Sequence, residues 1–83
     1  MSEELICTMW IDPVRQRRLD DLLDRLDVAF SSLWVSDSAT QSGPHRVQQY
    51  TYSIRGSKRM LDAVDRRLDS DCVNVTKRVR KEV

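Results

Sequence analysis

The side chains that could do acid–base, redox or metal chemistry are few in this chain of 83 residues: two cysteines, one histidine and thirteen acidic residues. The single histidine, His45, follows Pro44 in a small polar segment. A metal site needs further ligands nearby, and none accompanies His45 at a suitable spacing. We therefore expect a solvated loop histidine, and we expect neither a metal nor a cofactor.

Cys7 and Cys72 suggest a redox pair at first sight. They stand, however, on segments expected to form neighbouring antiparallel strands, with Cys72 opposite the end of the first strand and Cys7 opposite about Thr76. Several residues at ~3.4 Å each then separate the two sulfur atoms, which is too far for a disulfide. We expect both to be reduced core residues that are at least partly buried.

The acidic residues gather in an amphipathic segment, Pro13 to Asp27, where they alternate with arginines. Such alternation is typical of a solvated helix face with ion pairs between neighbouring turns. The sequence holds no Ser-His-Asp set, glycine-rich phosphate loop or spaced carboxylate pair. We therefore expect that the protein is not an enzyme.

This acidic and basic segment is the helix around which the chain is organised. Asp12 is a suitable N-cap and Pro13 suits the first helical position. One apolar stripe follows at helical spacing, and it consists of Leu19, Leu22, Leu23 and Leu26. A second helix is expected after Ser57, with its stripe at Leu61, Val64 and Leu68.

Four strands complete the chain, and a loop over Asp37 to His45 joins the middle two. The strands are expected at Glu4–Ile11, Phe30–Ser36, Arg46–Arg55 and Cys72–Val79. The helix segment Arg17–Asp27 aligns without gaps to Arg59–Asp69, as two similar halves would. The order β-α-β-β-α-β with right-handed crossovers predicts an α+β, ferredoxin-like domain over residues 1–83. Its antiparallel sheet has the strand order 4-1-3-2, with both helices on one face.

Alternation along the strands divides the side chains between the two faces of this sheet. The helix-covered face is expected to hold Leu5, Cys7, Met9, Leu33, Val35, Tyr50, Tyr52, Ile54, Val73, Val75 and Val79. The open face is expected to hold Ile6, Thr8, Trp10, Trp34, Val47, Gln49, Thr51, Asn74 and Thr76. Two tryptophans and two aliphatic residues on an open face indicate an interface, with candidate residues Ile6, Trp10, Trp34, Val47, Gln49 and Thr51. The alternative is a slip in register that places one tryptophan in the core.

Basic residues gather where the third strand ends, the second helix begins and the fourth strand ends. They are Arg55, Lys58, Arg59, Arg78, Arg80 and Lys81. Together with a helix N-terminus they form a second candidate site, for a nucleic acid or a phosphate-bearing ligand. RNA modules of this topology stack bases on both central strands, whereas here only Trp10 offers such a ring. A solvated basic rim is the simpler interpretation.

Composition bounds the remaining possibilities. A net charge of +1 argues against a dedicated polyanion binder. No apolar run approaches the ~20 residues of a membrane span, and the acidic start MSEELICTMW is unlike a signal peptide. We expect a cytoplasmic protein without a membrane partner.

The predicted topology and the turn Trp10-Ile11-Asp12-Pro13 resemble small regulatory modules of the ACT type. Such domains often carry an Asp and a Pro-Gly at the first strand-to-helix turn, and they commonly pair through sheets or helices. Val14 stands here where the glycine would be, which argues against amino-acid binding at this turn. The resemblance implies a non-enzymatic regulatory or protein-interaction module, associating through its open sheet face with a protein partner or with itself as a homodimer.

Overall fold

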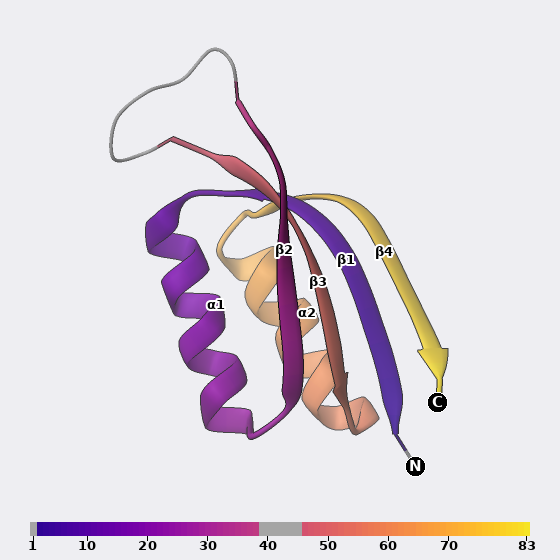
Figure 1. The fold of residues 1–83 in the computed structure, drawn as a ribbon. Helices are drawn as coiled ribbons and strands as arrows, with labels where there is room; N and C mark the ends of the chain where they lie inside the picture. Colours follow the sequence, from indigo (N-terminus) through magenta and orange to yellow (C-terminus); the bar gives the residue numbers. More distant parts are fainter. Residues whose placement is uncertain (1, 39–45) are drawn as a thin grey trace.

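The computed structural model describes residues 2–38 and 46–83. The elements follow the order β1 (Glu3–Ile11), α1 (Pro13–Leu26), β2 (Ala29–Asp37), β3 (Gln48–Gly56), α2 (Lys58–Ser70) and β4 (Asn74–Glu82). The strands form one antiparallel sheet of order β2-β3-β1-β4, and both helices lie on the same side of it (Figure 1). The predicted ferredoxin-like fold, its strand order and its single helical layer are confirmed.

Both helices begin at the predicted caps. The Asp12 carboxylate accepts a hydrogen bond from the backbone N–H of Arg15 at 2.8 Å, and Pro13 occupies the first turn of α1. Ser57 Oγ accepts the backbone N–H of Met60 at 3.3 Å at the start of α2. These bonds satisfy backbone donors that would otherwise lack a partner in the first helical turn.

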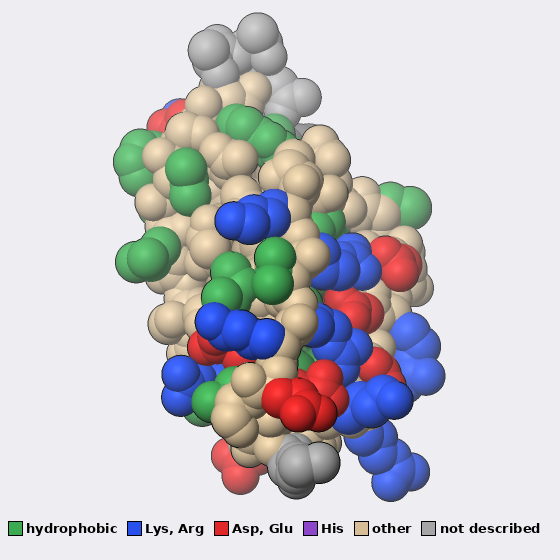
Figure 2. Space-filling model, turned by 90° about the vertical axis from the view of Figure 1, so that its right-hand side faces the viewer, with side chains coloured by type: hydrophobic (Ala, Val, Ile, Leu, Met, Phe, Trp, Pro, Cys, Tyr) green, Lys and Arg blue, Asp and Glu red, His purple; other side chains and the backbone are tan. Residues whose placement is uncertain are grey.

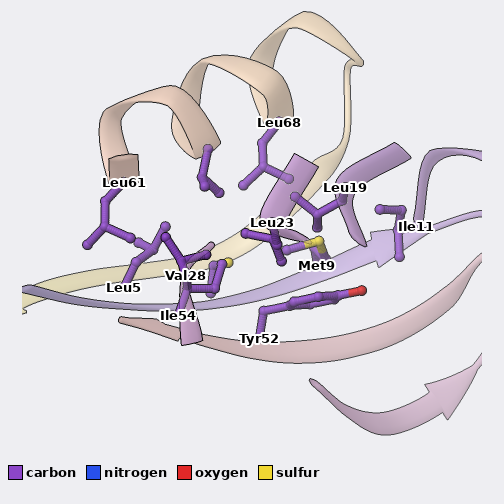
Figure 3. Packing of buried hydrophobic residues seen from close by; sticks show 12 residues of the cluster. Leu5, Met9, Ile11, Leu19, Leu23, Val28, Tyr52, Ile54, Leu61 and Leu68 are labelled. Carbon is purple, nitrogen blue, oxygen red and sulfur yellow. The ribbon is translucent and has the colours of Figure 1, made fainter. Parts of the chain in front are cut away.

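The core lies between the helices and the inner face of β1 and β3. Tyr52 is buried at its centre (Figure 3), where its hydroxyl donates to Asp20 Oδ1 at 2.7 Å. The buried apolar residues are Leu5, Cys7, Met9, Ile11, Leu19, Leu23, Val28, Tyr52, Ile54, Leu61, Val64 and Leu68. The predicted inward residues of β1 and β3 are therefore largely confirmed, as are the main stripe residues of the helices.

The predicted facing of β2 is wrong. Trp34 lies opposite Tyr50, and Phe30 lies opposite Ile54. Directly opposed residues of an antiparallel pair point to the same face, so Phe30 and Trp34 lie on the helix side. Leu33 lies opposite Thr51 on the open side. The strand therefore adopts the other of its two possible phases, because Phe30 packs near Tyr52, with ring centroids 6.4 Å apart.

A second correction concerns β4. The register with β1 shifts between Thr8 and Met9, where Thr8 lies opposite Lys77 and Met9 lies opposite Val75. The extra residue is Thr76, and such a bulge reverses the alternation beyond it. Val75 consequently lies on the helix side as predicted, whereas Val79 lies opposite Ile6 on the open face. His45 and the Gly43-Pro44 turn lie outside the described residues.

Candidate interaction surface

The open face of the sheet is the side away from the helices. Four rows of directly opposed residues cross it, and from β2 to β4 they are Ala29, Arg55, Glu4 and Lys81; Ser31, Ser53, Ile6 and Val79; Leu33, Thr51, Thr8 and Lys77; and Ser36, Gln49, Trp10 and Asn74. Charged side chains occupy one end row, Trp10 the other, and small hydroxyl residues the centre. We call these four rows the open face.

Small side chains leave the middle of the open face shallow. The hydroxyls of Thr8 and Thr51 are hydrogen-bonded at 3.0 Å across β1 and β3. Larger apolar groups flank them, with Leu33 69% exposed on β2 and Val79 40% exposed on β4. A second layer can therefore approach the centre closely while contacting apolar groups at its sides.

The structure brings together four of the six predicted interface residues, Ile6, Trp10, Gln49 and Thr51, on this face. Val47 lies just before β3 and lines a pocket with Trp10. Trp34 belongs to the other side of the sheet and does not join them. Leu33 and Val79 were missed, although the aromatic pair Phe30 and Trp34, two positions of the same phase, was a signal for the true facing of β2.

The pocket of about 340 Å³ lies at the end of the sheet, where β1 meets α1 and where α2 turns into β4. Its apolar wall is formed by Trp10, Ile11, Val47 and Val73, and its polar groups come from Asp12, Arg15, Ser38, Cys72 and Asn74. An apolar hollow with a few convergent polar groups is the usual form of a small-ligand site.

Asp12 and Arg15 form the electrostatic centre of this pocket. Burial alone would raise the pKa of the Asp12 carboxyl, but hydrogen bonds from the backbone and guanidinium of Arg15 outweigh it and lower that pKa. Arg15 Nε also donates to the carbonyl of Asp71 at 2.8 Å, which ties α1 to the turn before β4. The carboxylate is thus already ionised and paired, and the guanidinium is held in place at the pocket wall.

The predicted basic site is largely neutralised by neighbouring acidic side chains. Arg80 contacts Glu3, Asp62 and Asp65 at 3.1, 2.7 and 3.3 Å. Arg78 contacts Asp65 and Asp69 from the same side of β4. Figure 2 shows the resulting mixture of basic and acidic side chains on the face beside β4.

The other predicted basic residues are divided between two surfaces. Arg55 and Lys81 lie on the open face, where both contact Glu4, at 3.1 and 3.5 Å. The hydrogen bond from Arg55 lowers the pKa of the Glu4 carboxyl. Lys58 and Arg59 begin α2 and form no ion pair within 4 Å among residues 2–38 and 46–83. The six cations are therefore not one continuous basic surface.

The two cysteines are both free thiols. Cys7 is buried in the core, and burial raises the pKa of its thiol to about 11. Cys72 is exposed in the turn before β4, with a left-handed φ of 55°. The prediction that both thiols are reduced is confirmed, whereas the prediction that Cys72 is at least partly buried is wrong, because the chain turns away from the core before the strand begins.

Other kinds of site have little support in the described part of the chain. No three His, Cys, Asp or Glu side chains there are grouped so that they could hold a metal ion. None of the helices has the length and apolar character needed to cross a membrane. A cytoplasmic location stays a prediction of the sequence.

Comparison with known proteins identifies the fold. No family model matches the chain, and no curated protein matches its sequence. CPII from Thiomonas intermedia K12, in a structure with ADP, AMP and acetate bound, is 11% identical with a TM-score of 0.59, over 99% of this chain and 89% of that chain. A functionally unknown protein from Pediococcus pentosaceus ATCC 25745 is 13% identical with a TM-score of 0.62, over 100% of this chain and 93% of that chain. At such identities the likeness concerns the fold, and the ACT type stays a prediction.

Proposed function

We propose that this protein is a non-enzymatic interaction module that associates with a second copy of itself through the open face. The single observation that carries the proposal is the one-sided helical layer. Both helices cover the same side of the sheet, so that Ile6, Thr51 and Val79 have no second layer above them within the described chain.

The shape of this face suits a sheet-to-sheet contact. Stacked sheets pack about 10 Å apart, and small central residues such as Thr8, Thr51 and Ser53 permit that approach. Leu33, Val79 and Trp10 supply apolar surface around them, whose burial stabilises an interface by roughly 25 cal/mol per Å². A small domain has a thin core of its own, so covering this face adds a substantial share of stability.

The proposal is tested by placing a charge at the centre of the open face. Thr51→Arg puts a guanidinium between the two sheets, where it would lack a partner, so we expect a lower mass in sedimentation equilibrium. Ser70→Arg makes a matched change at an exposed position at the end of α2 and is expected to leave the mass unchanged. Circular dichroism checks that both variants are folded. An unchanged mass for folded Thr51→Arg would refute association through this face.

The pocket at the end of the sheet supports a second candidate function, the binding of a small ligand with a flat apolar group. Its support is the arrangement of Trp10, Val47 and Arg15 around one hollow, together with the adenine nucleotides named for the Thiomonas structure of the same fold. A ring could stack on the indole while an anionic group approaches the guanidinium.

ADP titration followed by tryptophan fluorescence tests this second function. In Trp34→Phe, Trp10 is the only indole, and its emission is expected to change saturably. In Trp10→Phe, the remaining indole lies outside the pocket and its emission is expected not to change. The absence of a saturable change in Trp34→Phe at millimolar ADP would remove adenine nucleotides as candidates.

A further inference from the structure

The two edges of the sheet differ strongly in charge. β2 and β4 are the outer strands. The stretch Ala29–Ser36 of β2 has no charged residue, whereas β4 carries Lys77, Arg78, Arg80, Lys81 and Glu82. Charged residues on an edge discourage pairing with another strand, and their absence leaves a free row of backbone donors and acceptors open to pairing. β2 is therefore the unguarded edge.

Exposed apolar side chains are concentrated on this same strand. Among the described residues six large hydrophobic side chains are exposed, and three of them are consecutive on β2: Leu33 at 69%, Trp34 at 55% and Val35 at 46%. A bulge beyond Trp34 interrupts the register, which leaves Ala29–Trp34 as the regular part of the edge.

The exposed residues project from both sides of the sheet. Leu33 lies on the open side, opposite Thr51, and Trp34 lies on the helix side, opposite Tyr50. A layer stacked on the open face would cover Leu33 but would leave Trp34 in water. A further strand beside β2 supplies neighbours on both sides at once, because its own side chains alternate in the same way.

We propose that two copies of this chain pair antiparallel through β2, so that two four-stranded sheets form one continuous sheet of eight strands. A pair of identical strands closes on itself by twofold symmetry. Pairing of β2 with β4 of another copy would instead continue without closure, and it would set apolar Leu33 and Trp34 beside the charged edge.

The twofold arrangement that keeps the helices of both copies on one side pairs residues of the same face. Centred on Ser32, it sets Ser32 opposite Ser32 of the second copy, and Ser31 opposite the second copy's Leu33. Phe30 then lies opposite the second copy's Trp34, an aromatic cross-strand pair of the kind that stabilises sheets. The open faces of the two copies lie side by side in this dimer, so the inference extends the proposed function and uses a different surface.

A lysine at the centre of the edge tests the pairing. Ser32→Lys places like charges directly opposite one another across the twofold axis, and Ser32 is exposed and on the helix side, so the open face is untouched. We expect the mass in sedimentation equilibrium to fall relative to the unmodified protein, while the matched variant Ser70→Lys keeps the unmodified mass. An unchanged mass for Ser32→Lys would overturn the edge pairing.

The open-face variant separates this inference from the proposed function. Thr51→Arg is expected to keep a dimer joined through β2, and Thr51→Arg combined with Ser32→Lys is expected to be a monomer of 9.7 kDa. A monomeric Thr51→Arg single variant would overturn the edge pairing and leave the open-face association standing. The reverse failure, an effect of Ser32→Lys without any effect of Thr51→Arg, would leave the edge pairing standing and refute the open-face proposal.

Cross-linking provides a test that does not depend on weakening an interface. In a Cys72→Ser background, where the remaining thiol of Cys7 is buried, Ser32→Cys is expected to form a covalent dimer under mild oxidation. Ser70→Cys in the same background is expected to stay monomeric under denaturing electrophoresis. Equal cross-linking of the two variants would show random collision and contradict the proposed register.

Discussion

Trp34 lies directly opposite Tyr50 in the register of β2 and β3, on the side of the sheet that the helices occupy. Its indole is nevertheless 55% exposed, and its Nε1 donates a hydrogen bond to Asp37 Oδ1 at 3.2 Å. The ring therefore stands at the border of the core without entering it. This position removes Trp34 from the open face and makes it available to a neighbour beside β2.

The cap of α1 offers a first test of stability. Asp12→Ala removes the acceptor for the Arg15 backbone N–H and is expected to lower the free energy of unfolding by about 1 kcal/mol. Asp12→Asn keeps a capping oxygen and is expected to cost less. Urea denaturation of the two variants measures the difference, and equal losses would show that the cap itself contributes little.

Acid is expected to destabilise the fold through three carboxyl groups. The hydrogen bond from Arg55 lowers the pKa of Glu4, the hydrogen bond from Arg80 lowers the pKa of Asp62, and the bonds from Arg15 lower the pKa of Asp12 against the effect of burial. A lowered folded-state pKa stabilises the fold fully above the ordinary values of 3.8 to 4.5, and this contribution is lost as the pH falls through the folded-state pKa.

The free energy of unfolding, measured in urea at a series of pH values, should therefore decline below about pH 4. Asp12→Asn removes one of the three groups and is expected to show a shallower decline than the unmodified protein. The same decline in both proteins would exclude Asp12 as a contributor.

The two thiols are expected to differ in reactivity. Cys72 is exposed, whereas Cys7 is buried with a pKa of about 11, so the thiolate of Cys7 is scarce at neutral pH. A thiol reagent should modify one cysteine per chain in the native protein and both after denaturation. Rapid native modification of Cys72→Ser would show that the core opens more readily than its packing implies.

Arg80 is expected to stabilise the fold rather than bind nucleic acid. Its guanidinium contacts three carboxylates and is only 26% exposed, so Arg80→Ala should lower the free energy of unfolding by about 1–3 kcal/mol. Lys58→Ala, at an exposed position without an ion pair among the described residues, is the control and should cost little. A sub-micromolar complex with RNA or DNA at physiological salt, weakened by both changes, would restore the nucleic-acid alternative.

The sequence predicted the fold well because several signals agree. The Asp12 and Ser57 caps, the leucine stripes and the alternation on β1 and β3 all favour one topology. The phase of β2 could not be predicted reliably, because both Phe30, Ser32, Trp34 and Leu33, Val35 alternate plausibly. Which set faces the core depends on packing against Tyr52, a contact distant in the sequence. The position of Val79 depends on a bulge at Thr76, for which the sequence carries no glycine or proline signal.

The candidate site was predicted in part for the same reasons. Ile6, Trp10, Gln49 and Thr51 lie on regular strands, so alternation placed them correctly on the open face. The basic residues were placed at one end correctly, but their neutralisation by Glu3, Glu4 and the aspartates of α2 depends on side chains that meet only in the folded chain.

The most direct test of the central claim is the solution mass of the unmodified protein at micromolar concentration, at physiological salt and at about 0.5 M salt, where the screening length is roughly 4 Å. Association through the small and apolar residues of the open face predicts a mass above the 9.7 kDa of one chain under both conditions. A monomer at both salt concentrations would contradict the account.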